Sequence, residues 1–224
     1  MAIAIDSTGE GSSVGSVNSL TLSFNNVGGD FMFVTFCEDT GSPSQSSVTY
    51  NGVGLTALTT LSSPFANNKM GWILKSPATG TNDIVATRTT TSTAIIRLCV
   101  ATYSGTDTTT QPDSQNTFTV GPATSGSAST TVVASNCWLV MSYENDGGIG
   151  NNVSAGASTV LRQANIDNGA VAILDSNATV GTGSQSLNYS TTLSNTHFGN
   201  IISLKPAGAA VISRRNDLLL LNVG

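Results

Sequence analysis

Two acidic pairs are the residues best suited to chemistry by their type and spacing. Glu38 and Asp39 follow one apolar run, and Glu144 and Asp146 follow another. A glycosidase needs two carboxyl groups about 5–9 Å apart across a sugar-sized cleft. Because both glutamates come at the end of a buried strand, where the chain must turn, we expect them to share a structural place rather than a catalytic one. Whether a calcium ion binds near Glu38 or Glu144, with help from neighbouring carbonyl oxygens, stays open at this point.

The histidine and the cysteines do not suggest a catalytic or metal-binding site. His197 is the only histidine, and it stands at the start of an expected strand, which favours a surface or strand-edge position. Cys37, Cys99 and Cys137 each lie inside an apolar run and form no Cys-x-x-Cys pair, so we expect buried, reduced thiols. We therefore predict that the chain is not an enzyme, with no catalytic residue, no metal site and no cofactor.

Aromatic side chains could instead form a platform for sugars, since a ring face stacks on the apolar face of a pyranose. Trp72 and Trp138 fall inside expected strands, where packing in the core is the default role. Tyr50 stands next to the turn-forming dipeptide Asn51-Gly52. We expect Tyr50 to be exposed, and it is the candidate glycan contact.

Two apolar runs must position these residues. The segments 30–39 and 136–145 are near-continuous runs of aromatic and β-branched residues, entered by Asp or Asn and left through acidic residues. Such runs are typical of strands buried on both faces. Between them, Asn51-Gly52 separates two β-forming segments and predicts a hairpin with a type I′ turn.

The pattern of the chain repeats after about a hundred residues. Residues 168–179 resemble 68–79, residues 198–208 take the place of 95–105, and 136–145 take the place of 30–39. This order predicts an internal duplication with halves of about 1–105 and 106–206 and about seven short strands in each.

The predicted fold is therefore all-β. We expect a jelly-roll-like antiparallel β-sandwich of about 14 strands over residues 1–206, with the two halves interleaved around one core. The alternative is two tandem, seven-stranded, immunoglobulin-like sandwiches. We prefer the first arrangement because the connector at 106–114 is short. No apolar stripe of helical period occurs before the C-terminal tail.

The segment 207–224 differs from everything before it. It carries four consecutive leucines after two arginines, and burying one leucine side chain contributes about 1.5–3 kcal/mol. We predict that this tail docks, either on its own sandwich or on a partner. Its candidate contact residues are Arg214, Arg215, Leu218, Leu219, Leu220 and Leu221.

Composition excludes several classes of function. Charged residues make up 9% of the 224 residues and the net charge is −5, so no basic surface is expected for nucleic acid. No apolar stretch reaches the roughly 18 residues of a membrane-spanning helix. The first residues lack the basic and apolar regions of a signal peptide, so we expect synthesis in a cytoplasm.

Several segments resemble a loosely defined family. They are 48–56, with Tyr50-Asn51-Gly52; 72–81, with Trp72-Ile73-Leu74-Lys75; 103–107, with Tyr103-Ser104-Gly105; and 202–206, with Ser203-Leu204-Lys205-Pro206. Together these are similar to jelly-roll-like virion structural proteins of tailed bacteriophages. The resemblance covers roughly residues 1–206. It implies a sandwich fold and carries over no catalytic or metal-binding residues.

The hypothesis that follows is a non-enzymatic structural protein of the phage virion. A head decoration or minor capsid protein that binds the assembled shell fits best, with the major capsid protein or neighbouring subunits as partners and a homo-oligomer as the expected state. The alternative is a tail-fibre or adhesin domain that binds host surface glycans.

Overall fold

The computed structural model describes residues 2–13, 17–38, 45–61, 70–89, 95–145, 152–165 and 171–208. The prediction of an all-β antiparallel sandwich of about 14 strands is confirmed, since these residues form 15 strands and no helix. None of them belongs to a helix that could span a membrane. The strands are β1 (Ala4–Ser12), β2 (Ser19–Asn26), β3 (Phe31–Glu38), β4 (Gln45–Tyr50), β5 (Val53–Gly54), β6 (Thr56–Ala57), β7 (Gly71–Lys75), β8 (Gly80–Arg88), β9 (Ile96–Ser104), β10 (Ser114–Val132), β11 (Trp138–Asn145), β12 (Val153–Ala155), β13 (Val160–Asn165), β14 (Val171–Asp175) and β15 (Gly183–Leu204).

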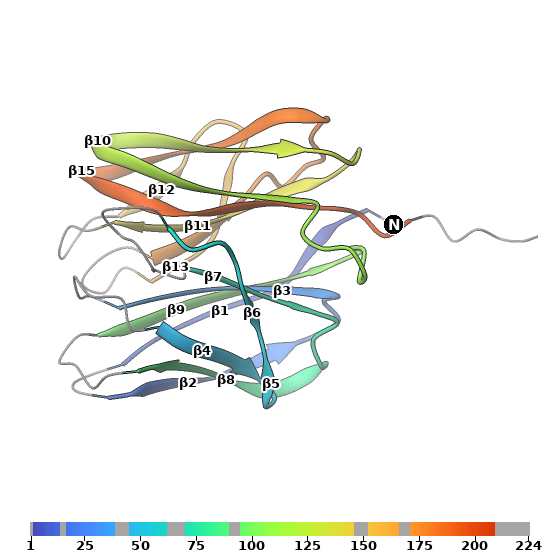
Figure 1. The fold of residues 1–224 in the computed structure, drawn as a ribbon, viewed down its shortest axis with the longest axis vertical. Helices are drawn as coiled ribbons and strands as arrows, with labels where there is room; N and C mark the ends of the chain where they lie inside the picture. The colour runs from blue at the N-terminus through green and yellow to red at the C-terminus, as the bar shows by residue number, and fades with distance from the viewer. Residues whose placement is uncertain are drawn as a thin grey trace, which may run out of the picture.

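The strands form three sheets (Figure 1). The first half supplies a four-stranded sheet in the order β2-β8-β4-β5 and a five-stranded sheet in the order β1-β9-β3-β7-β6. The second half supplies a six-stranded sheet in the order β10-β15-β11-β14-β13, with β12 paired to β15.

The six-stranded sheet folds over itself because its two long strands bend together. The start of β10 pairs with the end of β15, from Ser114↔Ser203 to Val120↔His197, and after the bend Ser125↔Ser190 to Val132↔Gly183 form a second ladder. Gly121 and Pro122 lie in this bend, where the register shifts. The whole chain is therefore a stack of four β layers (Figure 1).

Three apolar clusters fill the spaces between the layers. Successive residues of β3 alternate between two of them: Phe33 packs toward the second half, whereas Met32 packs toward the four-stranded sheet. In β11, Val140 faces the first half and Leu139 faces the folded-over layer. The expectation that both runs are strands buried on both faces is thus confirmed.

The structure combines features of the two predicted arrangements: its strand pairing fits two tandem sandwiches, whereas its packing fits one shared core. Among the described residues, all ladder pairs join strands of the same half, as in two tandem sandwiches. Yet the halves share a core, because the inner sheets pack face to face through one apolar cluster. Asn200 adds polar links across this contact: its Nδ2 donates to the Thr59 carbonyl at 2.8 Å, and its Oδ1 accepts from the Gly71 N–H at 2.9 Å.

Local sequence explains the first-half hairpin. Asn51 and Gly52 have φ of 49° and 74°, as the type I′ turn requires, and they connect β4 to β5. The three cysteines are buried and unpaired, as expected.

Candidate interaction site at the connector end

The segment 105–113, called the connector below, joins the two halves at one end of the stack and is fixed by the end of β15. The Asp107 N–H donates to the Lys205 carbonyl at 2.9 Å, and Gln111 Nε2 donates to the same oxygen at 2.6 Å. The Lys205 N–H donates back to Gln111 Oε1 at 3.1 Å. These three hydrogen bonds hold the connector against Lys205, the residue that follows β15.

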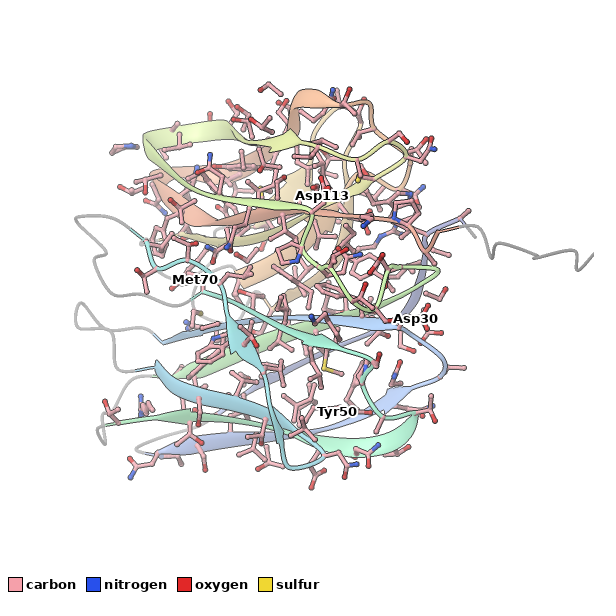
Figure 2. The ribbon with its side chains drawn as sticks, turned by 45° about the vertical axis from the view of Figure 1, so that its right-hand side comes forward. Asp30, Tyr50, Met70 and Asp113 are labelled. Atoms are coloured by element: carbon pink, nitrogen blue, oxygen red, sulfur yellow. The ribbon has the colours of Figure 1, made fainter. Side chains whose placement is uncertain are left out.

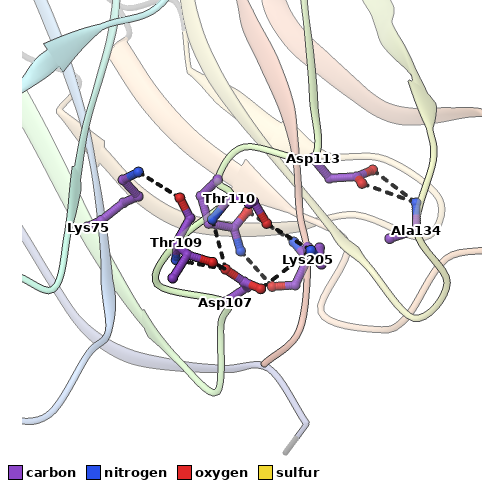
Figure 3. Close-up of polar contacts among 8 residues, drawn as sticks. Lys75, Asp107, Thr109, Thr110, Asp113, Ala134 and Lys205 are labelled. Carbon is purple, nitrogen blue, oxygen red and sulfur yellow. Dashed lines mark hydrogen bonds and ion pairs between the residues drawn. The ribbon is translucent and has the colours of Figure 1, made fainter. Parts of the chain in front are cut away.

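Asp107 organises the inside of the connector (Figure 3). Its Oδ1 accepts from the N–H groups of Thr109 and Thr110 at 2.7 and 2.8 Å, and from the Thr109 hydroxyl at 2.7 Å. Lys205 Nζ lies 3.4 Å from its other oxygen. The Thr110 N–H and then the two groups of Thr109 hold the pKa of Asp107 well below its usual range, so the carboxylate stays charged. Lys75 Nζ, from the first half, donates to the Thr109 carbonyl at 2.9 Å.

Asp6 fixes the turn between β2 and β3 at this same end. Its Oδ2 accepts from the N–H groups of Val27 and Gly28 at 3.2 and 3.1 Å, and from the Thr102 hydroxyl at 3.2 Å. Although partial burial opposes it, these hydrogen bonds, led by that from Gly28, lower the pKa of Asp6. The turn is therefore held by a charged group on the neighbouring strand β1.

Asp113 does the same for the turn between β10 and β11 (Figures 2 and 3). Its Oδ2 accepts from the Val133 N–H at 2.8 Å and from the Ser203 hydroxyl at 2.9 Å, and its Oδ1 accepts from the Ala134 N–H at 3.1 Å. Each of the two aspartates therefore holds one turn that leads from an outer layer into an inner strand.

A hollow of about 300 Å³ lies beside the connector. Asp30 and Asp107 line it, together with Thr106, Ala207 and Gly208. Asp30 Oδ2 accepts from the Gly105 N–H at 2.7 Å. Gly208 is the last described residue.

The expected equivalence of Glu38 and Glu144 is wrong by one residue. Phe31 pairs with Tyr103 as Trp138 pairs with Leu204, and this register makes Cys37, not Glu38, the equivalent of Glu144. A shift of one residue turns a side chain to the other face of a strand. Glu144 accordingly faces the shared core and is 9% exposed. Burial and then the neighbouring Glu144 raise the pKa of Cys37.

The side chains of the other three acidic residues of the two pairs are not placed by the structure. Asp39 and Asp146 lie outside the described residues, as does the side chain of Glu38. Within the described part of the chain, no three His, Cys, Asp or Glu side chains gather closely enough to hold a metal ion.

His197 is fully buried, so the expectation of a surface or strand-edge histidine is wrong. The reason is that β15 begins at Gly183 and not near residue 198, which places His197 inside a paired strand under the folded-over layer. Its ring centroid lies 5.4 Å from those of Tyr143 and Tyr189.

Tyr50 is also buried, and the expectation that it is exposed is wrong (Figure 2). Its side chain points into the core between the four-stranded and five-stranded sheets, and its hydroxyl lies 3.0 and 3.1 Å from the carbonyl oxygens of Ala78 and Gly80. A position before a turn can face either side of a sheet, and β4 turns Tyr50 inward. Its ring face is therefore not available for stacking on a sugar.

The predicted contact residues of the tail, Arg214, Arg215 and Leu218 to Leu221, lie outside the described residues. Sequence reasoning missed Asp6 and Asp113. A signal was present, because the dipeptide Asp-Ser occurs at 6–7 and again at 113–114, an offset equal to the true register of β3 and β11.

Comparisons of this chain with models of protein families, with curated proteins and with solved structures found no match. The candidate site therefore rests on its geometry alone: a rigid, carboxylate-fixed end of a β stack.

Proposed function

We propose that this chain is a non-enzymatic structural protein of a bacteriophage particle, a head decoration or minor capsid protein that binds the assembled shell. The observation that carries the proposal is the construction of the connector end, where four aspartates are engaged with main-chain N–H groups and the chain continues toward its leucine-rich segment. The phage assignment itself comes from the resemblance of the turn-and-strand motifs.

The placement of the groups that could do chemistry supports a binding role. Glu144 is enclosed in the shared core beside Cys37, and His197 is enclosed among tyrosines. A general acid or base must reach its substrate within hydrogen-bonding distance. Neither group lies where a substrate could reach it in this arrangement.

The sequence beyond the connector end supports docking on a neighbour. Four consecutive leucines would each contribute about 1.5–3 kcal/mol if buried. Arg214 and Arg215 precede them and suit an acidic partner surface. We propose that this segment extends the contact made by the connector end and binds shell subunits or further copies of this chain.

The test is whether the chain is a stoichiometric component of particles. Particles are purified by density gradient from a culture that carries the gene, and the chain is quantified by mass spectrometry and located by electron microscopy. We expect a fixed number of copies on the shell, and fewer copies for a variant that ends at residue 208. Full expression of the chain together with its absence from purified particles would contradict the proposal.

A hollow on the first half favours a second candidate, the binding of host glycans. It measures about 480 Å³ and is lined by hydroxyl, amide and carboxyl groups, including those of Thr49, Asn51, Asn82 and Asp83. Such groups suit a neutral, polyhydroxylated ligand. Glycan-array binding that is lost on Asn51→Ala but kept on Tyr50→Phe would support this function, and an array without any bound glycan would argue against it.

A further inference from the structure

We propose that the connector end is a two-point docking face, on which Val27 and Val133 each insert into the same apolar depression on two symmetry-related copies of one partner subunit. This inference rests on the proposed function, since it requires a partner built from repeated copies. It assigns the contact to residues of the folded stack rather than to the tail.

The first observation is that the two turns are equivalent. Asp6 precedes Ser7, which pairs with Thr102, and Asp113 precedes Ser114, which pairs with Ser203. In each half the hydroxyl of the β9 or β15 residue donates to the aspartate, and that aspartate accepts two successive N–H groups of the turn. The first of these N–H groups belongs to Val27 in one half and to Val133 in the other.

The second observation is exposure. Val27 and Val133 are each 69% exposed, although both turns are fixed by a carboxylate. The other large apolar side chains exposed in the described residues are Val53 at 54% and Leu193 at 46%, and these two do not occupy equivalent places. Single exposed valines need no explanation. Two at the same position of two halves, each held rigidly, form a repeated feature.

The third observation is the relation between the halves. Strand β1 of the first half packs against β13 of the second, and the N–H of Thr59, two residues after β6, donates to Gln115 Oε1 of β10 at 3.4 Å. The start of β10 is the equivalent of β1, and β13 is the equivalent of β6. In each half, the edge formed by β1 or β10 therefore lies against the edge formed by β13 or β6 of the other half. This reciprocal contact is the arrangement found in an isologous dimer.

This reciprocal packing defines an approximate two-fold axis. Both turns lie at the connector end, because Asp6 is next to Thr102 near the end of β9, where the connector begins, and Asp113 is next to Ser203 near the end of β15, to which the connector is hydrogen-bonded. The axis must therefore run parallel to the strands, between the two inner sheets, and leave the molecule at the connector end, with Val27 and Val133 on either side.

A partner that matches this face has the same symmetry. Closed assemblies of identical subunits present pairs of copies related by two-fold axes. Two equal contacts on one rigid body strengthen binding because the second becomes intramolecular. The face also carries Asp6, Asp30, Asp107 and Asp113 against two lysines, Lys75 and Lys205, so the depressions should be bordered by basic or neutral side chains.

The experiment uses shells purified from cells in which the gene is deleted, and purified chain added back. Binding is measured by co-sedimentation over a range of concentrations for the parent chain, Val27→Ser, Val133→Ser and the double variant. We expect each single change to weaken binding about tenfold to a hundredfold and by a similar factor, and the double change to abolish saturable binding.

Leu193→Ser is the matched control, because Leu193 is also exposed but lies in the bend between the two β10–β15 ladders, away from the two turns. We expect it to bind like the parent chain. All changed side chains are exposed, so circular dichroism and the unfolding midpoint should stay unchanged in every variant. These measurements separate lost contact from lost folding.

The outcomes distinguish this inference from the proposed function. If the parent chain binds shells but either valine can be changed without loss, two-point docking is wrong and the shell-binding function stands. Two-point docking is equally wrong if removal of residues 209–224 abolishes binding while the double variant binds normally. If the parent chain does not bind shells at all, the proposed function fails.

Discussion

Tyr103 of the first half donates a hydrogen bond to Asp175 of the second, with Oη 3.2 Å from Oδ2, inside the core that the halves share. Burial and then the Asp175 charge raise the pKa of Tyr103, so the phenol keeps its proton and remains a donor. Arg162 Nε lies 2.6 Å from the same carboxylate oxygen, and the Asp175 side chain is fully buried. The Tyr103–Asp175 hydrogen bond therefore adds a charged group to the apolar and Asn200 contacts that join the halves.

Tyr103→Phe should lower the free energy of unfolding by about 1.5–3 kcal/mol, because a hydrogen bond to a buried charged group is lost without change in shape. Arg162→Met should cost more, about 3–5 kcal/mol, since it leaves the Asp175 carboxylate without its cation. Urea unfolding followed by fluorescence measures both values.

Tyr50→Phe is the comparison for these variants, because among the described residues its hydroxyl bonds to the neutral groups of Ala78, Gly80 and Asn82, all in the first half. It should cost about 0.5–1.5 kcal/mol. An equal loss for Tyr50→Phe and Tyr103→Phe would mean that the link between halves contributes nothing beyond an ordinary hydrogen bond.

Asp6→Ala and Asp113→Ala should destabilise the chain by similar amounts, about 1 kcal/mol each, as for a side chain that caps main-chain N–H groups. The two effects should add in the double variant because the sites share no partner. Asp83→Ala, at an exposed position of β8, should be within about 0.5 kcal/mol of the parent chain. A loss for Asp113→Ala alone would show that the halves are not equivalent in energy.

Gly199→Ala should be strongly destabilising, because a Cβ at this position would lie 2.1 Å from the Ser142 carbonyl oxygen of the paired strand β11. Overpacking of this kind costs about 1–3 kcal/mol, and more when backbone must move. Gly54→Ala is the control, since a Cβ there meets nothing within 4 Å. Thermal unfolding of the two variants should differ clearly, and equal midpoints would refute the close approach of the strands.

Asp107 should make stability depend on pH. Its pKa in the folded chain lies below the ordinary value of 3.8, so its contribution is fully present above that pH. As the pH falls through 3.8, the unfolded chain takes up the proton first, and this contribution is progressively lost. Asp107→Asn should therefore be less stable than the parent chain at neutral pH, with the difference shrinking in acid. Unfolding midpoints at several pH values test this, and a difference that stays constant with pH would be the contrary result.

The sequence by itself determined the class of fold. The two long apolar runs and the Asn51-Gly52 turn predicted buried strands and a hairpin, because these signals are local. The sequence also predicted a duplication, because similar apolar segments recur in the same order after about a hundred residues.

Only the tertiary structure decided which face of each strand is covered by a neighbouring layer. Similarity of the two apolar runs matched Glu38 with Glu144, whereas strand pairing shifts the match by one residue and turns Glu144 into the shared core. Burial of Tyr50 and His197 likewise depends on which layer covers their strands. The period of a strand is two residues, so a sequence pattern shows that faces alternate but not which face is covered. Only the stacking of the halves brought Asp6, Asp113 and the connector to one end.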